Sequence, residues 1–171
     1  MLIYHPAYDV NHCVYRIVLI VENSSIKRIP LDLIVLQDLY VLFPHLLKEI
    51  RPFPADLRSY KKVVEGIGQP YEFMRNAGRV AAQIKVIQMA AIKSLLAKEV
   101  LSIESFQQGY IERTRSDLPD GLASLLESDL NAKESWFYLV VNELPSQKLT
   151  GKGGLKERSG LLEFRYDVED V

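Results

Sequence analysis

The chain of 171 residues has few of the groups that cross-link, anchor or activate small proteins. Its single cysteine, Cys13, cannot form an internal disulfide, as is usual for a protein of a reducing compartment. No apolar run reaches the roughly 18–20 residues that a membrane helix needs. Residues 1–6 lack the basic flank and the apolar stretch of a signal peptide. The sequence therefore predicts a cytoplasmic protein that has no membrane partner.

A net charge of −1 hides an uneven distribution of charge along the chain. Residues 51–98 carry a net charge of +6, whereas residues 99–145 carry −6. A uniformly basic nucleic-acid binder does not have this pattern. Alternating charge of this size suits docking on partners through complementary patches. The alternative is that the fold disperses these charges into a neutral mosaic.

The spacing of apolar residues predicts a mainly helical protein. Asp9 is placed to cap a helix that runs to residue 23, and Pro30 opens a second helix that runs to residue 43. This second helix and residues 132–142 carry more apolar side chains than one buried stripe uses, so we expect some to face a partner. The longest expected helix spans residues 79–98, and Ser102 is placed to cap a helix to residue 114.

For the last third of the chain, the sequence predicts shorter helices and strands. A capping-box spacing at residues 131–134 predicts a helix to residue 142, although 136–141 could equally be a strand. The glycine-rich loop 150–154 and the alternating residues 161–166 predict a hairpin.

Two helices over 79–114 followed by a glycine-rich hairpin are typical of a winged helix-turn-helix. The expected fold is thus mainly α, related to the winged helix, with a small C-terminal β-hairpin as the wing. We expect a single compact domain over 1–171. The proline- and glycine-rich stretch 51–70 would allow a subdivision into 1–66 and 70–171.

Candidate catalytic or metal-binding residues are few. His5, Asp9, His12 and Cys13 are four potential zinc ligands within nine residues. However, side chains of successive helical residues point about 100° apart, so we expect a capped and packed helix start. The chain has only three histidines, no Gly-x-Ser-x-Gly turn and no phosphate-loop order around its glycine-rich loop. We therefore expect no catalytic residue, cofactor or metal, and no enzymatic activity.

Basic side chains are the remaining candidates for contact with phosphates or with a partner. One group lies on the longest expected helix and just before it, and the other on the C-terminal loop and strand. Flexible lysines on a glycine-rich loop suit contacts with the DNA backbone, whereas long basic side chains also simply cover a helix flank. The candidates are Arg75, Arg79, Lys93, Lys148, Lys152, Lys156, Arg158 and Arg165.

Both ends of the chain resemble one known family. Residues 4–9 (YHPAYD) and 154–167 (GLKERSGLLEFRYD) are similar to the ends of the middle components of bacterial ABC-three-component systems, in particular of Lamassu-type antiphage defence systems. The resemblance implies a helical, winged-helix-related fold and an SMC/Rad50-like ATPase subunit and a nuclease-type effector subunit as partners. It also implies a subunit that holds the effector until foreign DNA is sensed, and it supplies no catalytic residues.

The sequence therefore favours a non-catalytic bridging subunit of a DNA-sensing defence complex, which meets DNA through the assembled complex. The alternative is a free-standing winged-helix DNA-binding regulator. The acidic segment 99–145 and the near-zero net charge weigh against that regulator.

Overall fold

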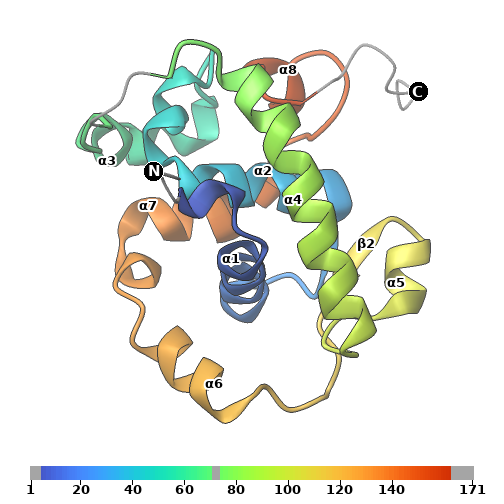
Figure 1. Cartoon of the computed structure of the whole chain (residues 1–171). Coiled ribbons are helices and arrows are strands. Elements are labelled where there is room, and N and C mark those ends of the chain that lie inside the picture. The colour runs from blue at the N-terminus through green and yellow to red at the C-terminus, as the bar shows by residue number, and fades with distance from the viewer. Residues whose placement is uncertain (1–4, 71–73, 163–171) are drawn as a thin grey trace.

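Three helices form the centre of the molecule in the computed structural model, which describes residues 5–70 and 74–162 (Figure 1). Helix α1 (Val10–Asn23) packs against both α2 (Leu31–Leu42) and the long helix α4 (Ala77–Ala97). The shorter elements surround this centre. They are the 3₁₀ helices η1 (Pro6–Tyr8), η2 (Pro44–Glu49), η3 (Ala55–Tyr60), η4 (Asn131–Lys133) and η6 (Leu144–Ser146), the π-helix η5 (Leu139–Glu143), the helices α3 (Lys61–Glu65), α5 (Ile103–Gln107), α6 (Asp120–Glu127), α7 (Ser135–Tyr138) and α8 (Leu155–Ser159), and the strands β1 (Arg28–Pro30) and β2 (Tyr110–Glu112).

Helix starts lie where the sequence places the caps. The Asp9 side chain accepts a hydrogen bond from the amide of His12 at 2.9 Å. Ser102 accepts one from the amide of Ser105 at 3.2 Å. Each bond satisfies an amide that the helix itself leaves without an acceptor, so these two predictions are confirmed.

Helix α2 is enclosed by the rest of the chain. All nine residues from Leu33 to Val41 are buried, and they include Gln37 and Asp38. The side-chain Nε2 of Gln37 donates to the carbonyl of Val140 at 3.0 Å, which joins α2 to the buried π-helix η5. The surplus apolar residues of these two segments are therefore used inside the fold. Our expectation that they face a partner is wrong for α2 and η5, whereas Phe43 is half-buried and Tyr138 is 52% exposed.

A buried polar cluster ties the three central helices together. The Asp38 carboxylate on α2 accepts hydrogen bonds from the Arg16 Nε on α1 at 2.6 Å and from the Gln88 Nε2 on α4 at 2.8 Å. Each of the three side chains is less than a tenth exposed. Because an unpaired charge in this position would be costly, the cluster fixes how the helices align.

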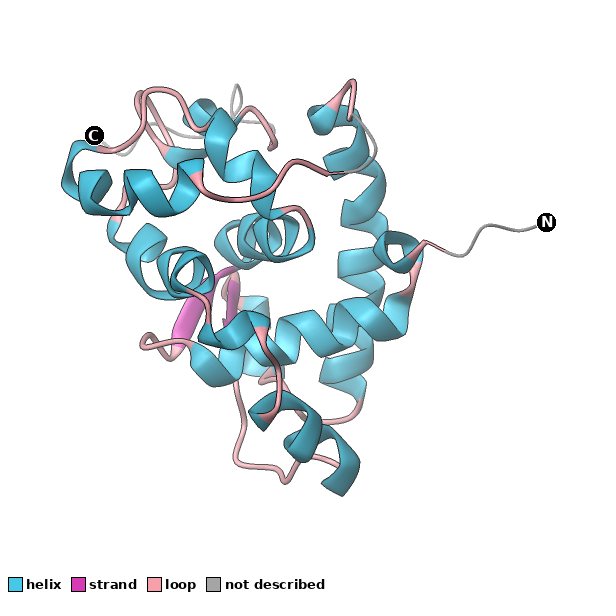
Figure 2. Ribbon diagram, turned by 90° about the vertical axis from the view of Figure 1, so that its left-hand side faces the viewer, coloured by secondary structure: helices cyan, strands magenta, loops and turns pink. Residues whose placement is uncertain are grey.

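A two-stranded antiparallel sheet lies against α2, and its strands are drawn in magenta in Figure 2. Ile29 of β1 lies opposite Ile111 of β2, and both side chains are fully buried. The helix expected to continue to residue 114 ends at Gln107, because the chain turns at Gly109 (φ +85°) and enters β2. The prediction of a mainly helical fold with a small antiparallel sheet is confirmed, but the described sheet joins residues 28–30 to 110–112.

The C-terminal segment differs from the expected wing. Residues Leu155–Ser159 form helix α8, which ends at Gly160 in the left-handed conformation (φ +65°). Leu161 and Leu162 follow as a bend, so they form no strand. The rest of the expected strand, including Arg165, lies outside the described residues. The relation to winged-helix proteins and the subdivision into 1–66 and 70–171 stay predictions.

Helix α4 is long and apolar enough to span a membrane by length and composition alone. A core helix passes the same test, and α4 packs with one side against α1. Its inner side includes the hydrogen-bonded Gln88, and its outer side carries Lys85 and Lys93. Residues 136–141, for which a strand was the alternative, lie in α7 and η5 and are helical.

Candidate functional site

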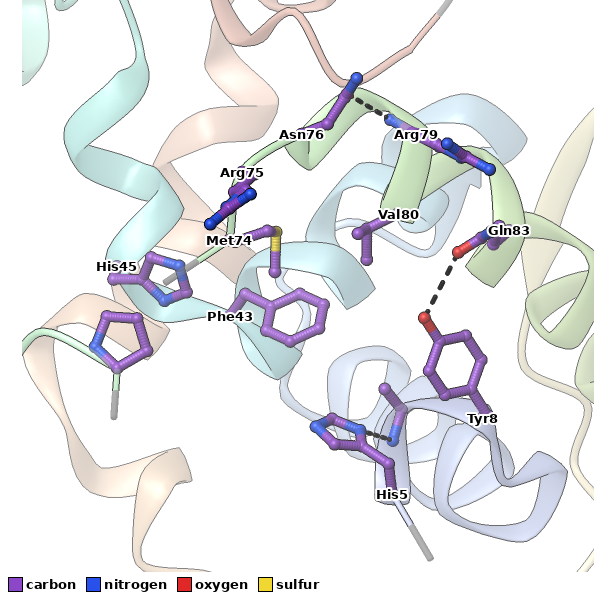
Figure 3. Close-up of a pocket in the computed structure, with 12 residues that line it drawn as sticks. His5, Tyr8, Phe43, His45, Met74, Arg75, Asn76, Arg79, Val80 and Gln83 are labelled. Carbon is purple, nitrogen blue, oxygen red and sulfur yellow. Dashed lines mark hydrogen bonds between the residues drawn. The ribbon is translucent and has the colours of Figure 1, made fainter. Parts of the chain in front are cut away.

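A cavity of about 720 Å³ opens between η1, the end of α2 and the start of α4 (Figure 3). Phe43 and Met74 lie in the middle of the view, with Val80 beside them. Arg75 and Arg79 lie along the α4 side. We call this cavity the α4 pocket.

The N-terminal wall of the α4 pocket is held by local hydrogen bonds. The His5 Nδ1 accepts a hydrogen bond from the amide of Ala7 at 3.1 Å, which caps η1. The Tyr8 hydroxyl donates to the Gln83 Oε1 at 3.4 Å and so links η1 to α4. His5 and Tyr8 also meet edge to face, with their ring centroids 5.9 Å apart. This wall is therefore built before any ligand arrives.

The second wall of the pocket is formed by the residues that follow α2. Phe43 and His45 flank Pro44, at which η2 begins, and their rings meet edge to face at 6.1 Å. Partial burial lowers the pKa of His45, and the positive charge of Lys48 lowers it further. The His45 imidazole is consequently neutral at physiological pH.

The third wall is the start of α4. Asn76 caps the helix by accepting a hydrogen bond from the amide of Arg79 at 2.9 Å. The guanidinium groups of Arg75 and Arg79 are exposed and make no hydrogen bond or ion pair with any described residue. The described lining of the pocket includes no aspartate or glutamate. Since the start of a helix is the positive end of its dipole, this wall attracts an anion.

The predicted basic residues fall into several separate places. Arg75 and Arg79 are brought together at the α4 pocket. Lys93 is exposed on the same helix, about 21 Å further along it at the rise of an α-helix. Lys148 and Lys152 are exposed on the loop before α8.

Lys156 and Arg158, which we expected on the C-terminal loop and strand, lie in helix α8. The Lys156 side chain is only 5% exposed, and its Nζ lies 2.6 Å from the Asp32 Oδ2. The Arg158 side chain donates to the carbonyls of Gly153 at 2.6 Å and Pro52 at 3.0 Å. Both side chains hold the C-terminal segment against the body of the protein.

The four potential metal ligands near the N-terminus differ in how deeply they are buried. Cys13 is fully buried, with its Sγ 3.8 Å from the Asp38 Oδ2, whereas His12 is exposed. Burial and the neighbouring Asp38 carboxylate raise the pKa of the Cys13 thiol to about 12. Within residues 5–70 and 74–162, no three His, Cys, Asp or Glu side chains are grouped to hold a metal ion.

A second surface lies at residues 115–134, within the segment 99–145 that carries a net charge of −6 in the sequence. Figures 1 and 2 show α6 at the lower end of the molecule in both views. The segment carries a net charge of −3, and we call it the acidic arm. Leu125 and Leu130 are 59% and 76% exposed there, whereas Leu126 is buried.

The acidic arm is fastened to the body through Tyr15. The Tyr15 hydroxyl donates to the Asp129 Oδ2 at 2.7 Å and to the carbonyl of Leu125 at 3.2 Å. Burial, followed by the hydrogen bond and charge of Asp129, raises the pKa of Tyr15 to about 12. The hydroxyl is protonated at physiological pH and so can donate to Asp129.

Comparison with known proteins adds a family assignment. A family model described as ABC-three component (ABC-3C) system Middle Component 5 matches residues 2–167. No curated protein and no solved structure matches the chain.

Proposed function

Because the chain belongs to the ABC-3C system Middle Component 5 family, we propose that it is the bridging subunit of a defence complex. The match over residues 2–167 is the observation that carries the proposal, since it includes nearly the whole chain. A middle component of a multi-subunit system has protein partners. The chain would join an SMC/Rad50-like ATPase to a nuclease-type effector in the cytoplasm, as in Lamassu-type systems.

Two separate surfaces support a bridging role. The α4 pocket has a cationic rim, and the acidic arm has the opposite charge. Opposite charges on different surfaces select different partners and exclude the wrong ones. A subunit that joins two unlike proteins needs this property.

The acidic arm has the composition of a docking surface. Leu125 and Leu130 are more exposed than leucines of a folded chain usually are, and acidic side chains surround them in the sequence. An apolar centre within a polar rim is the usual anatomy of a protein interface. We assign the arm to a partner that has an apolar site with basic residues around it.

Middle components of ABC-3C systems are generally regulatory or adaptor subunits. We propose the same non-catalytic role for this chain. The complex, rather than this subunit alone, would sense DNA. The described basic side chains support this division, because Lys156 and Arg158 are engaged inside the fold and leave fewer cations for phosphates.

Co-expression with the neighbouring genes tests the proposal. The chain, the ATPase and the effector should purify together, and native mass measurement should give one complex that contains all three. DNA binding by the complex and by the chain alone is then compared over a range of salt concentrations. A chain that stays alone and binds DNA tightly would instead be the free-standing regulator.

A further inference from the structure

The α4 pocket combines an apolar interior with a cationic rim. Its volume of about 720 Å³ lies within the roughly 300–1,000 Å³ of ligand-binding pockets. Phe43, Met74 and Val80 supply apolar surface that the core only partly covers. This interior has room for a bulky apolar group.

The rim suits an anion beside that apolar group. Arg75 and Arg79 have no counter-charge in the described lining, and they lie within the first turn of α4 or next to it. Two guanidinium groups at the positive end of a helix of 21 residues bind carboxylates or phosphates well. The ligand therefore carries an apolar side chain and a negative charge close together.

A peptide fits this combination better than a nucleic acid does. Affinity for a nucleic-acid backbone grows with the number of cations that track its phosphates, and it needs no apolar chamber. Among the described lining residues only two cations lie at the cavity, and Lys93 is about 21 Å further along the helix. By contrast, one buried apolar anchor with flanking charges is how protein partners are usually held.

We infer that the α4 pocket binds an acidic peptide segment of a partner subunit. A bulky apolar side chain of that segment fills the space beside Phe43 and Met74, and an adjacent carboxylate pairs with Arg75 and Arg79. This inference rests on the proposed function, because it assigns the second docking surface of the bridging subunit.

A display library of random ten-residue peptides, selected on the purified full-length chain, tests the chemistry directly. Enriched peptides should place Leu, Ile, Met or Phe beside Asp or Glu. Binding of a labelled enriched peptide is then measured by fluorescence polarisation. No enrichment, or enrichment of basic or uncharged peptides, would overturn the inference.

The variants locate the binding on the pocket. Arg75→Glu with Arg79→Glu should weaken peptide binding at least about tenfold, because it replaces two attractive charge pairs by repulsive ones. Met74→Gln, which keeps the length of the side chain, should weaken it several-fold. The matched control, Lys85→Glu with Lys93→Glu, makes the same change of charge on exposed positions of α4 outside the described lining and should stay within about twofold.

Folding of each variant is checked by thermal melting, and all four arginine and lysine positions are exposed. Equal losses in the pocket variant and its control would mean non-specific charge attraction and would overturn the inference. A single-stranded DNA of 20 nucleotides that binds the wild type and is lost only in the pocket variant would assign the site to nucleic acid instead.

Assembly of the complex shows whether this inference fails, the proposed function fails, or both stand. If the wild type assembles and the pocket variant loses one partner, both stand. If the pocket variant assembles normally, the pocket serves no partner subunit and the inference fails alone. If the wild type assembles with nothing but binds acidic apolar peptides through Arg75 and Arg79, the bridging function fails and the peptide chemistry of the pocket stands.

Discussion

The Asp38 side chain lies at the centre of a buried polar cluster. Its carboxylate is fully buried and is shared by the Arg16 guanidinium and the Gln88 amide. Burial lowers the pKa of Arg16, but the hydrogen bond and charge of Asp38 outweigh this effect and keep the guanidinium charged. The pair therefore matters for stability mainly because removing one partner leaves the other charge buried and unpaired.

Replacing Asp38 alone should be severely destabilising. Asp38→Ala leaves the Arg16 charge buried without a partner and should lower the free energy of unfolding by about 3–5 kcal/mol. The double variant Arg16→Met with Asp38→Leu removes both charges and should lose much less. Urea denaturation measures both. An equal loss in the two variants would show that the pair contributes packing only.

Cys13 should be unreactive in the folded protein. Its pKa of about 12 means that almost no thiolate exists at pH 8, and its side chain is fully buried. Iodoacetamide should add no mass to the native chain and one adduct in urea, as measured by mass spectrometry. Rapid native labelling would mean that α1 opens locally from the core.

At the scale of elements, the loop before α8 and the helix itself form a fastened unit. A Cβ on Gly154 would lie 2.5 Å from the carbonyl oxygen of Thr150, so only glycine fits there. The amide of Leu155 donates to the carbonyl of Lys148 at 2.8 Å and closes the loop. The buried end of Lys156 then reaches Asp32 at the start of α2.

Charge reversal should destabilise the protein at the buried Lys156 but not at the exposed Lys152. Lys156→Glu places a second carboxylate against Asp32 and should lower the free energy of unfolding by about 2–3 kcal/mol, because Asp32 is partly exposed and keeps some hydration. Lys152→Glu on the exposed loop is the matched control and should stay within about 0.5 kcal/mol. Similar melting temperatures for both variants would contradict the packed position of Lys156.

Sequence reasoning succeeds where the determining interactions are local. Asp9 and Ser102 cap amides three residues away, so the pattern alone places both helix starts. It fails where partners are distant. The pairing of Lys156 with Asp32 and of β1 with β2 joins segments that periodicity treats separately.

The candidate site divides in the same way. Arg75 and Arg79 stand out in the sequence as basic residues around an expected helix start. The apolar interior does not, because Phe43 and Val80 have the spacing of core residues and only the fold leaves them partly uncovered. The asparagine cap at Asn76, flanked by two arginines, is the one local signal of an anion-binding helix start.

At the scale of the whole molecule, the α4 pocket and the acidic arm are separate surfaces that have different chemistry. Their lining residues share no position, since the pocket is built from residues before 84 and the arm from 115–134. Damage to one surface should therefore leave the other one intact.

The acidic arm should lose its partner independently of the pocket. Leu125→Ser with Leu130→Ser should leave stability within about 0.5 kcal/mol, since both side chains are exposed, yet remove one subunit from the purified complex. Val86→Ser is the control, because Val86 is 71% exposed on α4 and belongs to neither surface. Native mass measurement gives the composition. Loss of the same subunit from the arm and pocket variants would contradict a bridge with two ends.

The enclosure of α2 has a consequence during synthesis. Its nine buried residues are covered partly by η5, whose buried residues end at Val141, about 100 residues later in the chain. A ribosome that adds about 5–20 residues per second needs roughly 5–20 s to make that stretch. Throughout this interval the nascent chain presents a strongly apolar helix that lacks part of its cover. Exposed apolar surface of this kind makes an unfinished chain prone to aggregation until η5 has been made.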